Sequence, residues 1–298
     1  MQFKLKTWAL GSFPEIEISN EQFQSLYQSA EVLKAAMAIE EKYELVISNF
    51  LDLEKDSLAV SSDYMVRRSN NYSEFFDIRS TFNRRIVNLL TSTKLYIDQI
   101  QQHVKICNPE LTACVKNEFS KEYDTLFEYR FMEALRNYVQ HRGLAVHLVS
   151  HPAKWIEDDE SLLEFQTKIY TQKTNLEGDK AFKKSVALEM PDKVELILSS
   201  RKYISAISRV HSFIRSNIDT VVKSSRDLIE STINQYQDIN DGESIGLCAV
   251  SFEADGRLDN IIERVPLFLS WDDVRIELTN RNRCISNLEK RYVSGKCL

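Results

Sequence analysis

The chain contains few of the two residues that most often interrupt helices and strands. Its 298 residues include only 7 glycines and 5 prolines, whereas the average shares are about 7% and about 5%. Neither residue occurs within residues 15–108, 110–142 or 192–241. Because turns depend on glycine and proline, this distribution disfavours a turn-rich all-β fold and favours long helices.

The sequence also lacks the motifs of common nucleotide-binding and redox sites. It has no Walker-type phosphate loop and no GxGxxG, which removes the usual indication of a kinase, an NTPase or a dinucleotide enzyme. The five cysteines show no CxxC spacing and are odd in number, so reduced thiols are favoured over a disulfide framework. We expect no cofactor.

Long apolar segments and a strong net charge are missing as well. The amino terminus has no apolar run suited to a signal peptide, and no later segment approaches the ~20 apolar residues of a membrane span. Lys plus Arg is 38 and Asp plus Glu is 44, a net charge of −6, which argues against a polybasic protein. We expect a cytoplasmic protein without membrane contact, in which any nucleic-acid site is a local patch.

Apolar spacing predicts the order of the elements in the first part of the chain. The first nineteen residues alternate in places and predict one or two short strands before a helix that starts at Ser19 or Asn20. Asn20 can cap that helix. Apolar residues three and four apart then continue to Arg68, with a break expected near residues 51–62. Ser73 opens a second helix, which we expect to end near Lys105.

The segment after Pro109 predicts a long helix, and the pattern changes beyond it. The apolar positions within residues 110–142 form a broad stripe, so we expect one unbroken helix that runs antiparallel to the preceding one. We expect this helix to stop at Gly143 in a left-handed conformation. Short strands follow, a helix covers residues 193–236, and a hairpin is expected around a DG turn. A last helix ends at Tyr292.

These elements together predict a mainly α protein of the α+β class, an antiparallel helical bundle with additional short strands and long C-terminal helices. The expected organisation is an N-terminal strand segment over residues 1–19, a helical bundle over 20–143 and an α+β region over 144–298. The last region can pack onto the bundle as a single unit.

The most informative segment is the end of the helix before Gly143, where Arg136, Asn137 and His141 form R-N-x-x-x-H. On a helix Asn137 and His141 are four residues apart and share a face, and the long Arg136 side chain can swing toward the imidazole. One helical turn therefore offers a cation, an amide and a titratable base. Cleaving RNA without a metal requires groups that transfer protons and a cation over the phosphate.

This motif resembles that of the HEPN superfamily, helical-bundle proteins in which R-x(4–6)-H, commonly with Asn after the Arg, marks metal-independent endoribonucleases of toxin, defence and CRISPR systems. The match lies at Arg136, Asn137 and His141, and the resemblance covers roughly residues 70–143. It implies a HEPN-like bundle and an endoribonuclease of toxin or anti-phage defence type. These three residues would be catalytic, and the 2′-hydroxyl of the RNA would attack the neighbouring phosphate.

The resemblance also implies partners. In HEPN proteins two motif-bearing helices meet across a two-fold axis and build one cleft, so we expect a homodimer, with RNA as substrate and an antitoxin or sensor protein as a further partner. The alternatives are a non-catalytic HEPN-like nucleotide- or RNA-binding module and a helical protein-interaction module. A solvated helix end rich in Arg and His would produce the same pattern.

A basic segment before the motif is a candidate RNA path. Residues 64–85 hold five arginines against two acids, with aromatic residues between them, a combination that holds phosphates and stacks bases. An amphipathic helix with core aromatics and a solvated charged face has the same composition. The histidines and acids after Gly143 match no metal-ligand spacing, so we expect no metal site. The residues expected to contact RNA are Arg67, Arg68, Arg84, Arg85, Arg130 and Arg142.

Overall fold

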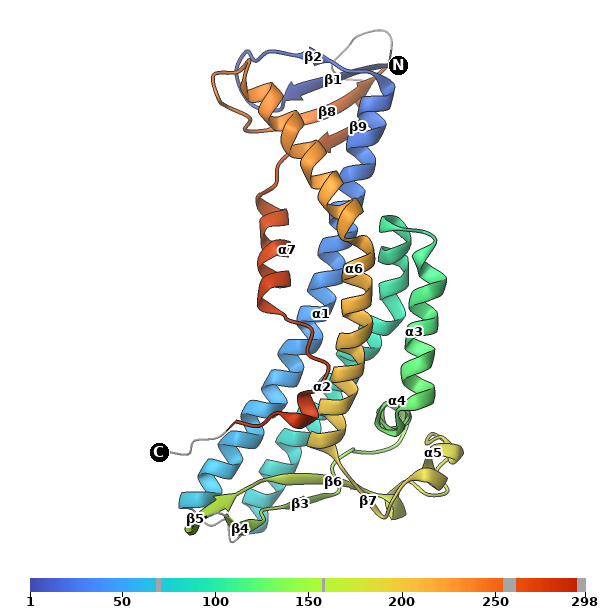
Figure 1. The fold of residues 1–298 in the computed structure, drawn as a ribbon, viewed down its shortest axis with the longest axis vertical. Coiled ribbons are helices and arrows are strands. Elements are labelled where there is room, and N and C mark those ends of the chain that lie inside the picture. The colour runs from blue at the N-terminus through green and yellow to red at the C-terminus, as the bar shows by residue number, and fades with distance from the viewer. Residues whose placement is uncertain (68–70, 157–158, 254–260, 294–298) are drawn as a thin grey trace. The chain divides into compact units, whose positions relative to one another are not determined.

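The computed structural model describes residues 1–67, 71–156, 159–253 and 261–293, and it is mainly helical with small antiparallel sheets (Figure 1). This confirms the predicted mainly α, α+β class, whereas the HEPN-like arrangement of the bundle stays a prediction. Within the described residues, no helix has the length and apolar character that a membrane crossing requires.

The chain divides into two compact units, each assembled from three stretches. The first unit holds Met1–Glu41, Ile100–Ala113 and Ile214–Arg283, and the second holds Lys42–Gln99, Cys114–Phe213 and Cys284–Leu298.

The first unit contains a four-stranded antiparallel sheet in the order β2-β1-β8-β9 (Figure 1). Every residue of β8 is buried, as expected of a short, continuous apolar strand between two neighbours. The predicted DG turn between β8 and β9 lies outside the described residues. The strands are β1 (Gln2–Thr7), β2 (Ile16–Glu17), β8 (Leu247–Phe252) and β9 (Ile261–Pro266).

Helix α1 (Asn20–Val66) begins at a capping box. The Gln22 amide donates a hydrogen bond to the Ser19 hydroxyl at 3.1 Å, and the Ser19 amide donates one to the Gln22 side chain at 2.8 Å. The cap is therefore Ser19, one residue before Asn20, which the sequence had predicted as the cap.

The predicted break near residues 51–62 is wrong, since α1 continues to Val66. In the second unit this stretch carries carboxylates that bind arginines of neighbouring helices. Arg85 donates to Asp52 at 2.8 Å and to Asp56 at 2.7 Å. The acidic residues that dilute the apolar pattern are thus part of the helix packing.

In the first unit, α7 (Ser270–Arg281) is joined to the second half of α6 (Leu196–Gln237) by an ion network. Asp272 is fully buried and accepts hydrogen bonds from Arg226 and Arg275 at distances between 2.5 and 2.9 Å. Burial raises the pKa of Asp272, but the hydrogen bonds and charges of the two guanidinium groups outweigh burial, and the net pKa is lowered.

The end of α7 corrects another prediction, because the helix stops at Arg281 and does not continue to Tyr292. Asn282 follows in a non-helical conformation, with φ −94° and ψ 77°. Arg215 Nη1 of α6 donates to the Asn282 carbonyl oxygen at 2.8 Å, and this bond replaces the partner that another helical turn would supply. A 3-10 helix, η2 (Leu288–Lys290), comes later in the chain.

Three helices follow α1, and short strands come after Gly143, as the change of pattern predicted. The helix expected from residue 193 begins only at Leu196, because Lys193–Glu195 pair with β6 as a strand. The strands form a sheet in the order β3-β6-β7 and a separate β4-β5 hairpin (Figure 1). The helices are α2 (Tyr72–Cys107), α3 (Leu111–Thr125), α4 (Phe127–His141) and α5 (Lys184–Glu189). The strands are β3 (Leu148–Ser150), β4 (Ala153–Ile156), β5 (Asp159–Phe165), β6 (Lys168–Gln172) and β7 (Lys193–Glu195).

The core of the second unit contains an aromatic cluster contributed by α1, α2 and α6. The Tyr43 ring stacks on the His211 imidazole with centroids 3.8 Å apart, and the Tyr43 hydroxyl lies 2.8 Å from the Ser208 hydroxyl. The Tyr96 hydroxyl lies 2.8 Å from His211 Nδ1. Phe119 packs edge-on against Tyr96, so α2 and α3 lie side by side in this unit.

Candidate functional site

The candidate site lies at the end of α4, which is separated from α3 by a break that the sequence did not predict. Leu126 between the two helices is extended, with φ −114° and ψ 113°, so the single helix expected over residues 110–142 is wrong. Arg130 Nη1 donates to the carbonyl oxygens of Tyr123 and Asp124 at 2.9 and 2.8 Å. These carbonyls end α3 without helical partners, and the arginine satisfies them.

Helix α4 is amphipathic and is fixed to α6 along one side. The Tyr203 hydroxyl of α6 donates to the Glu133 carboxylate, and Lys202 of α6 pairs with Glu128 at 2.6 Å. These polar contacts flank an apolar face that the helix turns inward. The buried residues of that face are Tyr129, Phe131, Met132, Ala134, Leu135 and Tyr138.

The three motif residues occupy the last two turns of α4. Asn137 and His141 are exposed and Arg136 is half-buried. Arg136 Nη1 donates to Asn137 Oδ1 at 2.9 Å. Because Asn137 and His141 are one turn apart on the same face, this bond draws the guanidinium toward the face that carries the imidazole. His141 is the last residue of α4 and therefore lies in its last turn, as the sequence predicted.

Gly143 follows the helix, but the predicted left-handed conformation is wrong, because Gly143 is not among the residues with positive φ. The chain leaves the helix at Arg142, with φ −137° and ψ −60°, and the Arg142 amide donates to the Tyr138 carbonyl at 2.8 Å. Glycine is needed here for a different reason. A Cβ at position 143 would lie 2.6 Å from the Tyr138 hydroxyl oxygen.

The predicted RNA contacts divide into exposed and paired arginines. Arg67 and Arg84 are exposed, and Arg68 lies outside the described residues. Arg142 is half-exposed and lies 3.5 Å from Asp179. The Arg67, Arg84 and Arg142 side chains are available to a ligand at little cost, since an exposed ion pair contributes little stability.

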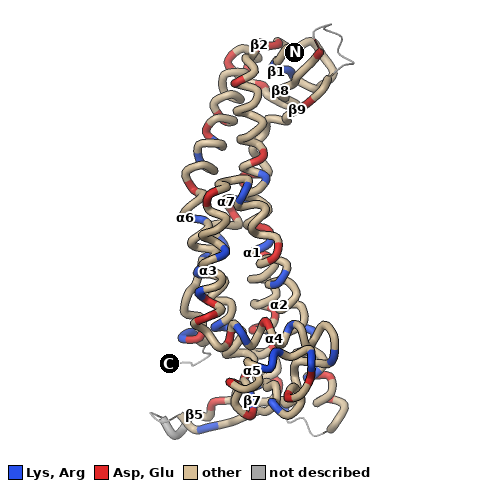
Figure 2. The backbone as a smooth tube through the Cα atoms, turned by 90° about the vertical axis from the view of Figure 1, so that its right-hand side faces the viewer, with Lys and Arg blue, Asp and Glu red and all other residues tan. Residues whose placement is uncertain are grey.

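Arg85 and Arg130 have intramolecular partners that hold the fold together. Arg85 bridges two α1 carboxylates, as described above, and Arg130 Nη2 donates to Glu189 of α5 at 2.7 Å. Figure 2 shows that basic and acidic residues are interspersed along the helices. RNA contact by these two arginines stays a prediction, and it competes with bonds already made within the chain.

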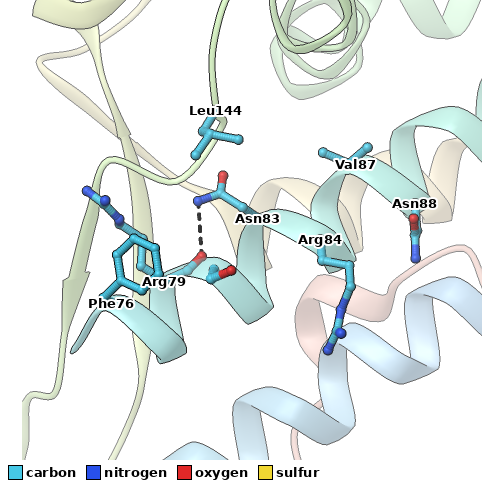
Figure 3. A pocket seen from close by; sticks show the side chains of 8 residues that line it. Phe76, Arg79, Asn83, Arg84, Val87, Asn88 and Leu144 are labelled. Carbon is cyan, nitrogen blue, oxygen red and sulfur yellow. Dashed lines mark hydrogen bonds between the residues drawn. The ribbon is translucent and has the colours of Figure 1, made fainter. Parts of the chain in front are cut away.

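A groove beside the end of α4 brings together residues that the sequence did not group. It has a volume of about 250 Å³, and one side chain, Leu144, reaches it from the loop after α4. Figure 3 shows Leu144 above α2, with Phe76 and Arg79 together at one end of the groove. The lining residues are Phe76, Arg79, Ser80, Asn83, Arg84, Val87, Asn88 and Leu144.

Asn83 attaches the loop after α4 to α2, and sequence reasoning missed this role. Its Oδ1 accepts a hydrogen bond from the Val146 amide at 2.9 Å, and its Nδ2 donates to the Arg79 carbonyl at 3.0 Å (Figure 3). Only 4% of the Asn83 surface is exposed. A buried asparagine on an otherwise apolar helical stripe was the available signal, because such an amide needs partners.

Nearby histidines are structural. His147 Nδ1 accepts a hydrogen bond from the Gln172 amide at 3.0 Å, and burial lowers the pKa of His147. His151 stacks on Tyr64, and burial lowers its pKa too. Among the described residues, no three His, Cys, Asp or Glu side chains form a group that could hold a metal ion.

Comparison with known proteins gave no match: no family model, no curated protein and no solved structure is similar to this chain.

Proposed function

We propose that this protein is a metal-independent endoribonuclease of the HEPN type, with the last two turns of α4 as its catalytic site. The observation that carries the proposal is the Arg136–Asn137 hydrogen bond of 2.9 Å at the exposed end of α4. It holds a cation on the face that also carries His141. A cation and a titratable imidazole on one exposed surface are the groups that phosphodiester transfer requires.

In the proposed reaction the 2′-hydroxyl of the RNA attacks the adjacent phosphorus. The His141 imidazole takes the proton of that hydroxyl as the new P–O2′ bond forms, and the Arg136 guanidinium stabilises the charge on the phosphorane oxygens. The P–O5′ bond then breaks and the leaving oxygen takes up a proton. The products are a 2′,3′-cyclic phosphate and a 5′-hydroxyl. Asn137 moves no proton and positions Arg136.

A second copy of the chain completes this chemistry. One imidazole cannot give a proton and take one in the same step, and α4 offers a single histidine. Two α4 helices that meet across a two-fold axis would supply a base and an acid from equivalent residues. The proposal therefore includes a homodimer through the exposed face of α4, acting on cytoplasmic RNA under the control of an antitoxin or sensor protein.

The test is incubation of purified protein with single-stranded RNA in excess EDTA, beside the Arg136→Ala and His141→Ala variants. We expect cleavage by the native chain and loss of most of it in each variant, with RNA binding retained, because phosphate attraction is spread over many basic groups. Binding without cleavage by the native chain would favour the non-catalytic module. Cleavage by His141→Ala, or cleavage that depends on Mg²⁺, would contradict the proposal.

A further inference from the structure

We propose that the groove on α2 is a nucleotide subsite, in which one base of a single-stranded RNA stacks at Phe76 while its phosphates lie against Arg79 and Arg84. The inference rests on the proposed function for its substrate, but its site is separate from the motif. The sequence grouped Arg84 with other arginines by composition alone. In the structure, Arg84 lines this groove.

The layout of α2 gives the groove a floor and two charged edges. At 100° per residue, Phe76, Ser80 and Val87 fall within about 40° of one another around the helix. Arg79 falls about 60° to one side of Phe76, and Arg84 about 80° to the other. Small and apolar side chains thus form the floor, and a guanidinium stands on each edge. Figure 3 shows Arg79 beside Phe76 and Arg84 farther along α2.

Phe76 is suited to base stacking. Its side chain is 49% exposed although it is a large aromatic group, and the Arg79 guanidinium lies 5.9 Å from its ring centroid. Bases stack on aromatic rings and on arginine planes alike, so this pair offers a stacking platform. The groove volume of about 250 Å³ is just below the range of pockets that enclose whole drug-sized ligands. We infer that this volume suits one base, with its phosphates at the edges of the groove.

The charges of the groove select an anion. Within the described part of the chain, neither Arg79 nor Arg84 forms an ion pair with a carboxylate, whereas Arg85, the next residue, binds two. None of the described residues that line the groove is acidic, and Asn88 adds an exposed amide near its far end. Two arginines without carboxylate partners, around an aromatic floor, match a phosphate and a base.

The groove is also close to the motif along the chain. Leu144, which forms one wall, follows His141 by three residues, a span of about 11 Å at most. The loop that carries Leu144 is fixed to α2 by the Asn83–Val146 hydrogen bonds. A strand held in the groove would therefore pass next to the end of α4.

The test measures binding of a fluorescently labelled, single-stranded oligoribonucleotide by anisotropy, in EDTA. All proteins carry His141→Ala, so that the RNA stays intact. We expect Phe76→Ala to weaken binding about tenfold. Arg79→Ala/Arg84→Ala should weaken it further and lower the salt slope by about 0.7 for each lost phosphate contact. The control, Lys116→Ala/Lys223→Ala, removes two exposed lysines and should bind as the parent does.

A competition arm separates a strand from a free nucleotide. We expect adenosine 5′-monophosphate to displace the oligonucleotide only at concentrations far above the oligonucleotide Kd. Displacement at equal concentration, or parental affinity in the Phe76 and Arg79/Arg84 variants, would overturn the subsite. Loss of binding in these variants without any cleavage by the native chain would uphold the subsite and overturn the endoribonuclease. Cleavage together with unchanged binding would do the reverse.

Discussion

Asn137 holds the Arg136 guanidinium through one hydrogen bond and transfers no proton in the proposed reaction. Its removal should therefore cost less than the removal of Arg136 or His141. We expect Asn137→Ala to lower kcat by an amount equivalent to one hydrogen bond to a charged group, about 1.5 to 3 kcal/mol, with KM little changed. Single-turnover cleavage of an RNA oligonucleotide measures this. A loss as large as that of His141→Ala would show that Asn137 does more than position the cation.

Gly143 shows how a residue can be correctly singled out for the wrong reason. The sequence predicted a helix stop that needs positive φ, whereas the structure requires space for the Tyr138 hydroxyl. Nothing in the local sequence indicates that the Tyr138 side chain turns back over the glycine.

This contact predicts that Gly143→Ala destabilises the protein. The new Cβ would overlap the Tyr138 hydroxyl at 2.6 Å, and overpacking of this kind costs about 1 to 3 kcal/mol. Urea unfolding measures the effect. The double variant Tyr138→Phe/Gly143→Ala removes the overlapping oxygen and should recover part of the loss. Equal stability of Gly143→Ala and the native chain would contradict the packing argument.

At the scale of elements, the sequence predicts the helix ends that the local residue pattern determines. The start of α2 is an example, because the helix begins at Tyr72, one residue before the predicted opening at Ser73. The cap itself differs: Asn71 Oδ1, two residues before Ser73, accepts a hydrogen bond from the Glu74 amide at 2.9 Å. The ends that the sequence missed depend on arginines of another helix. Arg130 satisfies the carbonyls at the end of α3, and Arg215 of α6 satisfies the carbonyl that follows α7. Such partners cannot be predicted from local spacing.

The α3–α4 break provides a test of this explanation. Arg130→Met keeps the length of the side chain but removes the bonds to two carbonyls and to Glu189. We expect a loss of about 2 to 4 kcal/mol in the free energy of unfolding, since hydrogen bonds to charged groups contribute about 1.5 to 3 kcal/mol and part of this one is exposed. Arg84→Met, an exposed arginine on α2, is the control and should change stability little. Equal effects of the two substitutions would contradict the role given to Arg130.

At the scale of the whole molecule, the composition predicts the fold class but not which strands pair with one another. The shortage of glycine and proline favoured long helices, and α1, α2 and α6 are long helices. The sheet of the first unit could not be foreseen, because β1 pairs with β8, more than two hundred residues later, with Leu5 opposite Ala249. Period-two patterning indicates a strand but not its partner. The same holds for the candidate site. The motif lies within one short segment and could be found from the sequence, whereas the groove combines α2 with a later loop and could not.

The stability of the protein should depend on pH through the half-buried His147. Burial lowers the pKa of His147 from its ordinary value of 6.5, and its Nδ1 accepts a hydrogen bond only while unprotonated. The unfolded chain therefore binds the proton more readily than the folded one. The contribution is fully present above about pH 6.5 and is lost as the pH falls from there through the folded-state pKa.

We expect the free energy of unfolding to fall more between pH 7.5 and 5.5 in the native chain than in His147→Asn, whose side-chain oxygen can still accept the Gln172 amide hydrogen. Urea unfolding at both pH values measures this difference. The comparison at pH 7.5 gives the cost of the substitution itself. Equal pH dependence in the two proteins would show that His147 is protonated without penalty.

The central claim, that the end of α4 cleaves RNA by attack of the 2′-hydroxyl, is tested most directly by the chemistry of the product ends. An oligoribonucleotide and its copy with 2′-deoxyribose at every position are incubated with the protein in EDTA and analysed by mass spectrometry. We predict 2′,3′-cyclic phosphate and 5′-hydroxyl ends from the RNA, no cleavage of the deoxy copy, and loss of the products in His141→Ala. Cleavage of the deoxy copy, or products with 5′-phosphate ends, would contradict the account.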